Sequence, residues 1–129
     1  DNGTFYMGLA DTTTSIRSTN NLIGFGVTAD SIRTITDSAG VETVNVPAGI
    51  TLTDWNEYRI EITRVSGANQ VEFFINDTLQ FTHTTNIPDM NAYLTFFTDN
   101  EAAAAGSNRL DVGAVTAKIH DADLGSWET

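Results

Sequence analysis

Hydrophobic and polar residues alternate most regularly in residues 55–84, and this stretch predicts three consecutive antiparallel strands. Tyr58, Ile60 and Ile62 alternate with charged residues, which is the period of two expected when one face of a strand is buried and the other is solvated. Residues 71–75, Val-Glu-Phe-Phe-Ile, repeat this period. We therefore expect one face of this sheet to lie against the core.

Two turn signals divide the same stretch. Residues 66–69, Ser-Gly-Ala-Asn, tolerate the backbone dihedrals of a turn, and Asn76-Asp77 is typical of a two-residue hairpin loop. The second loop leads into residues 78–84, which complete the meander.

Shorter alternating segments occur on both sides of the meander. They predict further strands at residues 4–9, 21–28, 31–36, 41–46, 91–99 and 109–119. Gly24 and Gly26 leave one face of the second of these strands without side chains, which allows a backbone or an aromatic ring to approach closely. The four alanines within residues 100–108 are too few for a helix that is stable on its own. About nine strands in one domain predict an antiparallel two-sheet β-sandwich.

Aromatic residues fall on both faces of the expected strands. Those expected in the core are Phe5, Phe25, Phe73, Phe81 and Phe96. Those expected on the opposite faces are Tyr6, Phe74, Tyr93 and Phe97. The second group could form either another buried layer or an exposed surface on which a sugar stacks.

The chain has 129 residues, no cysteine and a formal net charge of −11 at pH 7. This length suffices for a full core, so we expect residues 1–129 to form a single domain. The absence of cysteine excludes disulfides, thiolate nucleophiles and cysteine-ligated zinc. The negative charge disfavours binding to nucleic acid and to anionic membranes. No apolar run reaches the roughly 20 residues that cross a bilayer, so we expect no membrane insertion.

The second half of the chain resembles the concanavalin A-like lectin/glucanase superfamily, which includes laminin G-like modules. The residues that carry the resemblance are Trp55, the strand at residues 58–62, the Val-Glu-Phe-Phe-Ile-Asn-Asp hairpin at 71–77, Pro88, and Leu-Asp-Val-Gly-Ala-Val at 110–115. The resemblance implies a jelly-roll fold. It also implies recognition of carbohydrate or protein more often than catalysis.

Catalytic motifs are absent or incomplete. The glucanase branch of the superfamily carries an E-x-D-x-E strand, and the nearest match here, Glu57 to Glu61, has Arg59 in the central position. The two glutamates lie about 13 Å apart along an extended strand, which exceeds the separations used in glycoside hydrolysis. Neither H-E-x-x-H nor G-x-S-x-G occurs. A hydrolase or lyase with an atypical motif is the least favoured alternative.

Glu57, Arg59 and Glu61 point to one side of the first meander strand, and Glu72 and Phe74 point to the same side of its partner if the register brings like faces together. Such a patch contains a guanidinium donor, carboxylate acceptors and an aromatic plane, which are the groups that a sugar requires. The alternative is a solvated sheet face on which Arg59 bridges its acidic neighbours.

Asp99, Asn100 and Glu101 open the longest expected loop, and Asp89 comes from a neighbouring loop. Clustered oxygen ligands suit calcium, which superfamily relatives often carry at such loop edges. We therefore expect any bound metal to be calcium near residues 99–101, although these acids could simply solvate a turn.

The two histidines are not expected to carry chemistry. His83 lies in an expected strand, where it is predicted to be a surface residue, and His120 lies in a polar, acidic tail that is predicted to be solvated.

The first functional hypothesis is a non-catalytic recognition module that binds carbohydrate in an extracellular or virion-surface assembly. The alternative is a structural or assembly domain, such as a virion-decorating protein or an adhesin, that binds a protein partner or forms a homo-oligomer. Because the chain begins with Asp1 rather than methionine, we expect the domain to be excised from, or part of, a larger assembly.

Overall fold

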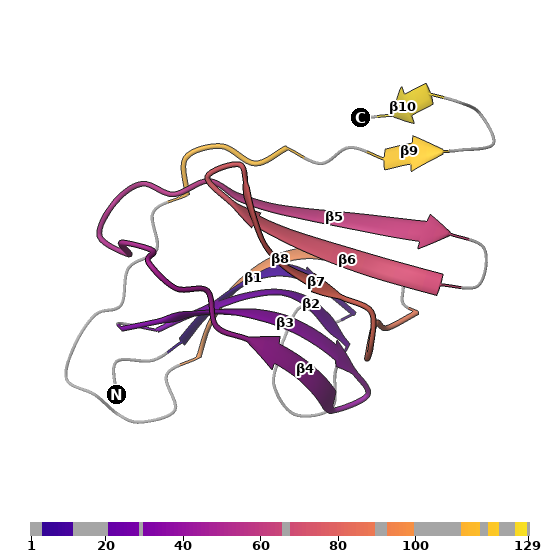
Figure 1. Ribbon diagram of the computed structural model, residues 1–129, viewed down its shortest axis with the longest axis horizontal. Helices are drawn as coiled ribbons and strands as arrows, with labels where there is room; N and C mark the ends of the chain where they lie inside the picture. Colours follow the sequence, from indigo (N-terminus) through magenta and orange to yellow (C-terminus); the bar gives the residue numbers. More distant parts are fainter. Residues whose placement is uncertain are drawn as a thin grey trace.

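The computed structural model describes residues 4–11, 21–28, 30–65, 68–89, 93–99, 112–116, 119–121 and 126–128. These residues form ten strands and no helix, and the two main sheets are both antiparallel (Figure 1). The predicted all-β architecture with two antiparallel sheets is therefore confirmed.

The larger sheet has five strands in the order β4-β3-β2-β1-β8. Its strands are β1 (Thr4–Ala10), β2 (Leu22–Val27), β3 (Ile32–Ser38), β4 (Val41–Asn45) and β8 (Tyr93–Asp99). Ala39 and Gly40, with φ of 53° and 86°, form the two-residue turn between β3 and β4. Both residues occupy the left-handed region, which places β3 and β4 in direct register through Ser38 and Val41.

The smaller sheet is the predicted meander, with β5 (Tyr58–Val65), β6 (Ala68–Ile75) and β7 (Thr78–His83) in sequence order. Asn76 and Asp77 both have positive φ, 50° and 61°, as a hairpin loop of two residues requires. Ala68 and Asn69, which the sequence places in the turn before β6, belong to β6 itself, because Val65 pairs with Ala68 and Arg64 pairs with Asn69.

The main core lies between the two sheets. Its fully buried side chains are Ile23, Phe25 and Ile32 from the larger sheet and Val71, Phe73 and Ile75 from the smaller one. The rings of Phe25 and Phe73 meet edge to face with their centroids 5.3 Å apart. Ile60 packs at the margin of this cluster, so the predicted inward faces of β5 and β6 are confirmed.

A second buried cluster lies on the other face of the larger sheet and contains Tyr6, Ala10, Leu22 and Ile35. A Cβ atom built on Gly26 would lie 3.2 Å from Cε1 of Tyr6 and 3.1 Å from Cδ1 of Ile35. The absence of a side chain at Gly26 therefore lets these two side chains approach the sheet, as the sequence predicts.

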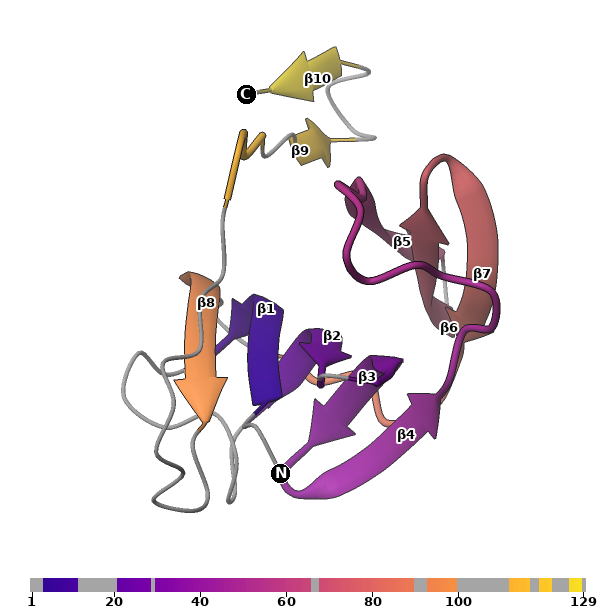
Figure 2. The same cartoon turned by 90° about the vertical axis from the view of Figure 1, so that its left-hand side faces the viewer.

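The two sheets are connected differently along their two sides (Figure 2). On one side β7 meets β3 and β4, where His83 hydrogen-bonds to Thr34 and Thr36. On the other side the larger sheet ends at β8 and the smaller sheet ends at β5, and the views show these strands spread apart. We call these the closed side and the open side.

Among the described strands, β9 (Ile119–Asp121) and β10 (Ser126–Glu128) pair with each other and with no other strand. The predicted strand at residues 109–119 is wrong over residues 112–116, which have no regular structure and are exposed, and its last residue, Ile119, is the first residue of β9. An alternating apolar pattern forms a strand only where a neighbouring strand supplies hydrogen-bond partners.

Tyr6 lies on the face opposite the main core and is buried in the second cluster, which is the buried-layer alternative for this group of aromatic residues. Two predictions for single side chains require correction. Phe96 faces inward but is 42% exposed because β8 is an edge strand. His83 is 1% exposed, so it is not a surface residue. It pairs across the sheet with Val71, which is fully buried, and therefore points toward the core.

Candidate binding face of the three-stranded sheet

The register of β5 and β6 places the predicted site residues on one face. Arg59 pairs with Phe74 and Glu61 pairs with Glu72, whereas Ile60 pairs with the buried Phe73. Since side chains alternate across a strand, the first two pairs point away from the core. The four residues therefore share the outer face of the smaller sheet, as the register argument from sequence predicts.

Glu57 lies just before β5 and anchors the end of this face through its backbone. Its N–H donates to Oδ1 of Asn76 at 2.9 Å, and Nδ2 of Asn76 donates to Oδ1 of Asn56 at 2.9 Å. The Glu57 side chain is exposed. These bonds hold the chain segment before β5 against the β6–β7 turn.

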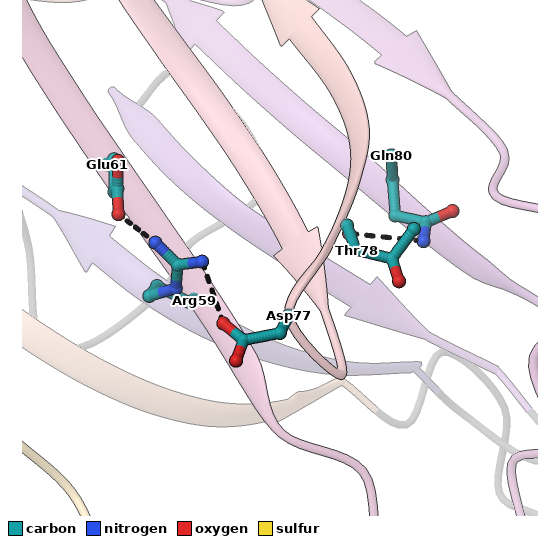
Figure 3. Close-up of polar contacts among 5 residues, drawn as sticks. All are labelled: Arg59, Glu61, Asp77, Thr78 and Gln80. Atoms are coloured by element: carbon teal, nitrogen blue, oxygen red, sulfur yellow. Dashed lines mark hydrogen bonds and ion pairs between the residues drawn. The ribbon is translucent and has the colours of Figure 1, made fainter.

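Arg59 is held by two carboxylates, one from its own strand and one from the β6–β7 turn (Figure 3). Its guanidinium donates from Nη1 to Oε1 of Glu61 and from Nη2 to Oδ1 of Asp77, the latter at 3.0 Å. Its Cζ also lies 3.9 Å from the centroid of the Phe74 ring. The guanidinium is therefore fixed above the sheet by two ion pairs and a cation–π contact.

This stacking changes the site that the sequence suggests. The sequence predicts that Arg59 and Phe74 offer a donor and an aromatic plane side by side, but the guanidinium covers one plane of the ring. A ligand on this face would meet the guanidinium first and the edge of Phe74 second. Arg59 also bridges two acidic side chains, Glu61 and Asp77, as the alternative of a solvated sheet face predicts for Arg59 and its acidic neighbours.

A β-bulge adds an apolar residue beside this site. The register shifts between Phe73 and Phe74, so that Phe74 pairs with Leu79 while Phe73 pairs with Phe81. The extra residue is Gln80, whose Nε2 donates to the carbonyl of Thr78 at 3.3 Å (Figure 3). Leu79 is thereby placed on the outer face next to Phe74, and it is exposed.

Sequence reasoning missed Asp77 and Leu79 as members of this face. The Asn76-Asp77 signal predicts a two-residue loop between β6 and β7. The registers of β6 with β5 and with β7 are needed to place Asp77 next to the start of β5. No pattern in the sequence indicates the bulge that redirects Leu79.

Trp55 is the most exposed of the large apolar side chains described, at 76%. It precedes β5, and a Cβ atom built on Gly113 would lie 3.6 Å from its Cζ3. The indole is therefore in contact distance of the 112–116 segment and otherwise open to solvent. Its position beside Asn56 places it at the same end of the smaller sheet as Asp77.

The predicted calcium ligands lie largely outside the described residues. The backbone of Asp99 ends β8, opposite Thr4, whereas Asn100 and Glu101 are not described. Within the described part of the chain, no group of three or more histidine, aspartate or glutamate side chains could hold a metal ion. The calcium site near residues 99–101 therefore stays a prediction. The His120 side chain also lies outside the described residues.

No protein-family model, curated protein or solved structure matches this chain. The described segments contain no helix with the length and apolar character needed to cross a bilayer.

Proposed function

We propose that this chain is a non-catalytic recognition module that binds carbohydrate through the outer face of β5, β6 and β7. The single observation that supports this is the pre-positioned guanidinium of Arg59, flanked by Glu61, Asp77 and Phe74 on an exposed sheet face. Fixed donors lose little conformational freedom when they bind hydroxyl groups. Glu72 and Leu79 extend the face with an acceptor and an apolar contact.

The proposal extends to fold and setting. We propose a concanavalin A-like jelly-roll topology on the basis of the sequence resemblance. The two antiparallel sheets are compatible with this topology. An extracellular or virion-surface location suits a cysteine-free, acidic, all-β domain with an exposed polar sheet face.

A glycan array followed by calorimetry on the strongest hit tests this function. Arg59→Ala should weaken binding about tenfold or more, since a hydrogen bond to a charged group contributes roughly 1.5–3 kcal/mol. Phe74→Ala should also weaken binding, because it removes the ring on which the guanidinium is stacked. Arg33→Ala is the matched control, because Arg33 is exposed on β3 of the other sheet. Equal affinity in all three variants, with folding intact, would contradict this assignment of the binding face.

A second candidate function is a structural or assembly role. It is favoured by apolar side chains that remain exposed on the edge strands of the larger sheet and beside them. They are Val41 and Val44 of β4, Val46 just after it, and Tyr93, Leu94 and Phe96 of β8. Exposed apolar edge strands pair readily with other chains.

Mass measurement by light scattering during size-exclusion chromatography tests the second function. An assembly domain should show a concentration-dependent mass that Leu94→Lys lowers, whereas Leu79→Lys, on the outer face of the smaller sheet, should leave it unchanged. A monomer at every concentration, together with glycan binding, would favour the first function over the second.

A further inference from the structure

His83 is a buried titratable group that the proposed binding face does not use. Its side chain is 1% exposed and crosses from β7 to β3, where Nε2 lies 3.0 Å from Oγ1 of Thr34 and Nδ1 lies 2.9 Å from Oγ1 of Thr36. The Phe73 ring packs against the imidazole with centroids 4.8 Å apart. The imidazole therefore links the two sheets from within the core.

The hydrogen-bond network assigns the tautomer of His83. The Thr36 hydroxyl donates its single proton to the carbonyl of Thr85 at 3.0 Å, so its oxygen must accept from the imidazole. Nδ1 consequently carries the proton, and Nε2 accepts from the Thr34 hydroxyl. In this neutral form the imidazole nitrogens and both threonine hydroxyls have hydrogen-bond partners. The same holds for all buried side-chain polar atoms in the described part of the chain.

A second bond set continues this connection toward the surface. Oγ1 of Thr43 on β4 lies 2.8 Å from Oγ1 of Thr85, and Nδ2 of Asn86 donates to Oγ1 of Thr43 at 3.0 Å. We call His83 with Thr34, Thr36, Thr43 and Thr85 the sheet clasp. It connects β7 and the residues after it to both β3 and β4.

Protonation of His83 disrupts this arrangement. A new proton on Nε2 points at Oγ1 of Thr34, which must then accept and turn its own proton elsewhere. The acceptor within reach is the carbonyl of Asn45, at 3.5 Å, which is the outer limit of a hydrogen bond. One buried donor is therefore left poorly paired, and a positive charge is placed against Phe73.

The titratable groups on the neighbouring strands do not face the imidazole to compensate this charge. They are Arg33 and Asp37 of β3, Glu42 of β4 and Glu72 of β6, and the loop after β7 adds Asp89. By strand alternation the first four point to the opposite faces of their sheets, since Thr34, Thr36, Val71 and Phe73 point inward. Asp37 accepts from the backbone N–H of Gly40 at 2.7 Å, and Asp89 is exposed.

We propose that His83 makes the closed side of the protein acid-sensitive, because protonation of its imidazole breaks the sheet clasp and releases β7 from β3. The device is independent of the proposed carbohydrate site, which lies on the outer face of the same sheet. It would let a mildly acidic environment loosen the contact between the two sheets while each sheet keeps its own ladder.

The direction of the pH effect follows from burial. Desolvation lowers the pKa of His83 below its ordinary value of 6.5. The unfolded chain therefore binds a proton at a higher pH than the folded chain, and the contribution of neutral His83 is fully present above pH 6.5. It is lost as the pH falls from 6.5 toward the lowered pKa, by up to about tenfold in the folding equilibrium constant per pH unit.

Urea unfolding at pH 7.5, 6.5 and 5.5 tests this proposal with a pair of matched variants. The chain has two histidines, so His120→Gln serves as the control for His83→Gln. The wild type and His120→Gln should lose stability steeply below pH 6.5, and His83→Gln should show a slope that is shallower by up to about tenfold per pH unit. Equal slopes in all three proteins would overturn the proposal.

Nuclear magnetic resonance of the wild type keeps the test valid if His83→Gln does not fold. The ring protons of His83 should titrate below pH 6.5, and nuclear Overhauser contacts from the imidazole to Thr34 and Thr36 should weaken over the same range while amide protection within both sheets stays high. Titration of His83 at or above 6.5 would overturn the proposal. So would a uniform loss of protection throughout both sheets.

Discussion

On both the closed side and the open side, strands direct side chains toward the gap between the two sheets, but these side chains differ in how far they are buried. On the closed side, His83 is 1% exposed and hydrogen-bonds across the gap to Thr34 and Thr36. On the open side, the inward-facing Leu94 and Phe96 of β8 remain 50% and 42% exposed. The polar side chain of His83 is thus buried where β7 meets β3. The apolar side chains of β8 stay exposed because no described strand lies against them.

The difference teaches that burial here depends on strand order more than on hydrophobicity. Phe96 pairs with Met7, which packs on the core, so its side chain has the orientation of a core residue. It lacks cover because β8 is the last strand of its sheet. The exposed apolar area on the open side is therefore a consequence of topology.

Two phenylalanines provide the largest test of this comparison, because both face inward and only one is covered. Phe73→Ala should lower the free energy of unfolding by about 3–5 kcal/mol, since it opens a cavity around a fully buried ring. Phe96→Ala, on the open side, should cost about 1 kcal/mol or less. Urea denaturation measures both values. A similar loss in the two variants would mean that the open side is covered in solution.

The sheet clasp predicts a smaller effect on the closed side. Thr36→Val keeps the shape of the side chain but leaves Nδ1–H of His83 without a partner and removes the 3.0 Å hydrogen bond to the carbonyl of Thr85. It should lower stability by about 1–3 kcal/mol, the cost of leaving a buried polar group unpaired. Thr63→Val, at an exposed position of β5, is the control and should change stability by less than about 0.5 kcal/mol. If the two variants were equally stable at pH 7.5, the clasp would contribute nothing to the closed side.

The β3–β4 turn offers a stabilising change on the same side. Ala39 has a φ of 53°, a conformation that disfavours any residue with a Cβ atom. Its N–H donates to Oδ1 of Asn21 at 2.9 Å, and a glycine keeps this backbone hydrogen bond. Ala39→Gly should raise stability by about 0.5–1 kcal/mol, because the relief of strain exceeds the added chain entropy. The shift in thermal midpoint measures the effect. A loss of stability would indicate that this turn is not strained.

The outer-face ion pairs should have the smallest effect on stability. Arg59 and Glu61 are both exposed enough for water to screen their interaction, so Arg59→Ala should cost about 1 kcal/mol or less, including the contact with Phe74. The cost should fall further at high salt. A salt-independent loss of several kcal/mol would assign Arg59 a structural role rather than the recognition role proposed for it.

The amino-acid sequence by itself determined the three strands of the meander and the faces of β5 and β6. The period of two in β5 and β6 and the Asn76-Asp77 loop predict the meander, and the register then places Arg59 beside Phe74. These features are local, because alternation and turn dihedrals depend only on residues close together in the chain.

Tertiary structure alone decided which of these faces are covered. His83 was predicted at the surface and is buried, Phe96 was predicted in the core and is exposed, and the guanidinium of Arg59 covers the ring that was expected to be open. The sequence pattern gives the direction in which a side chain points. Whether that side chain is buried depends on strands and side chains that are distant in sequence. Its burial is therefore decided by strand order, by the bulge between β6 and β7 and by the way the two sheets meet.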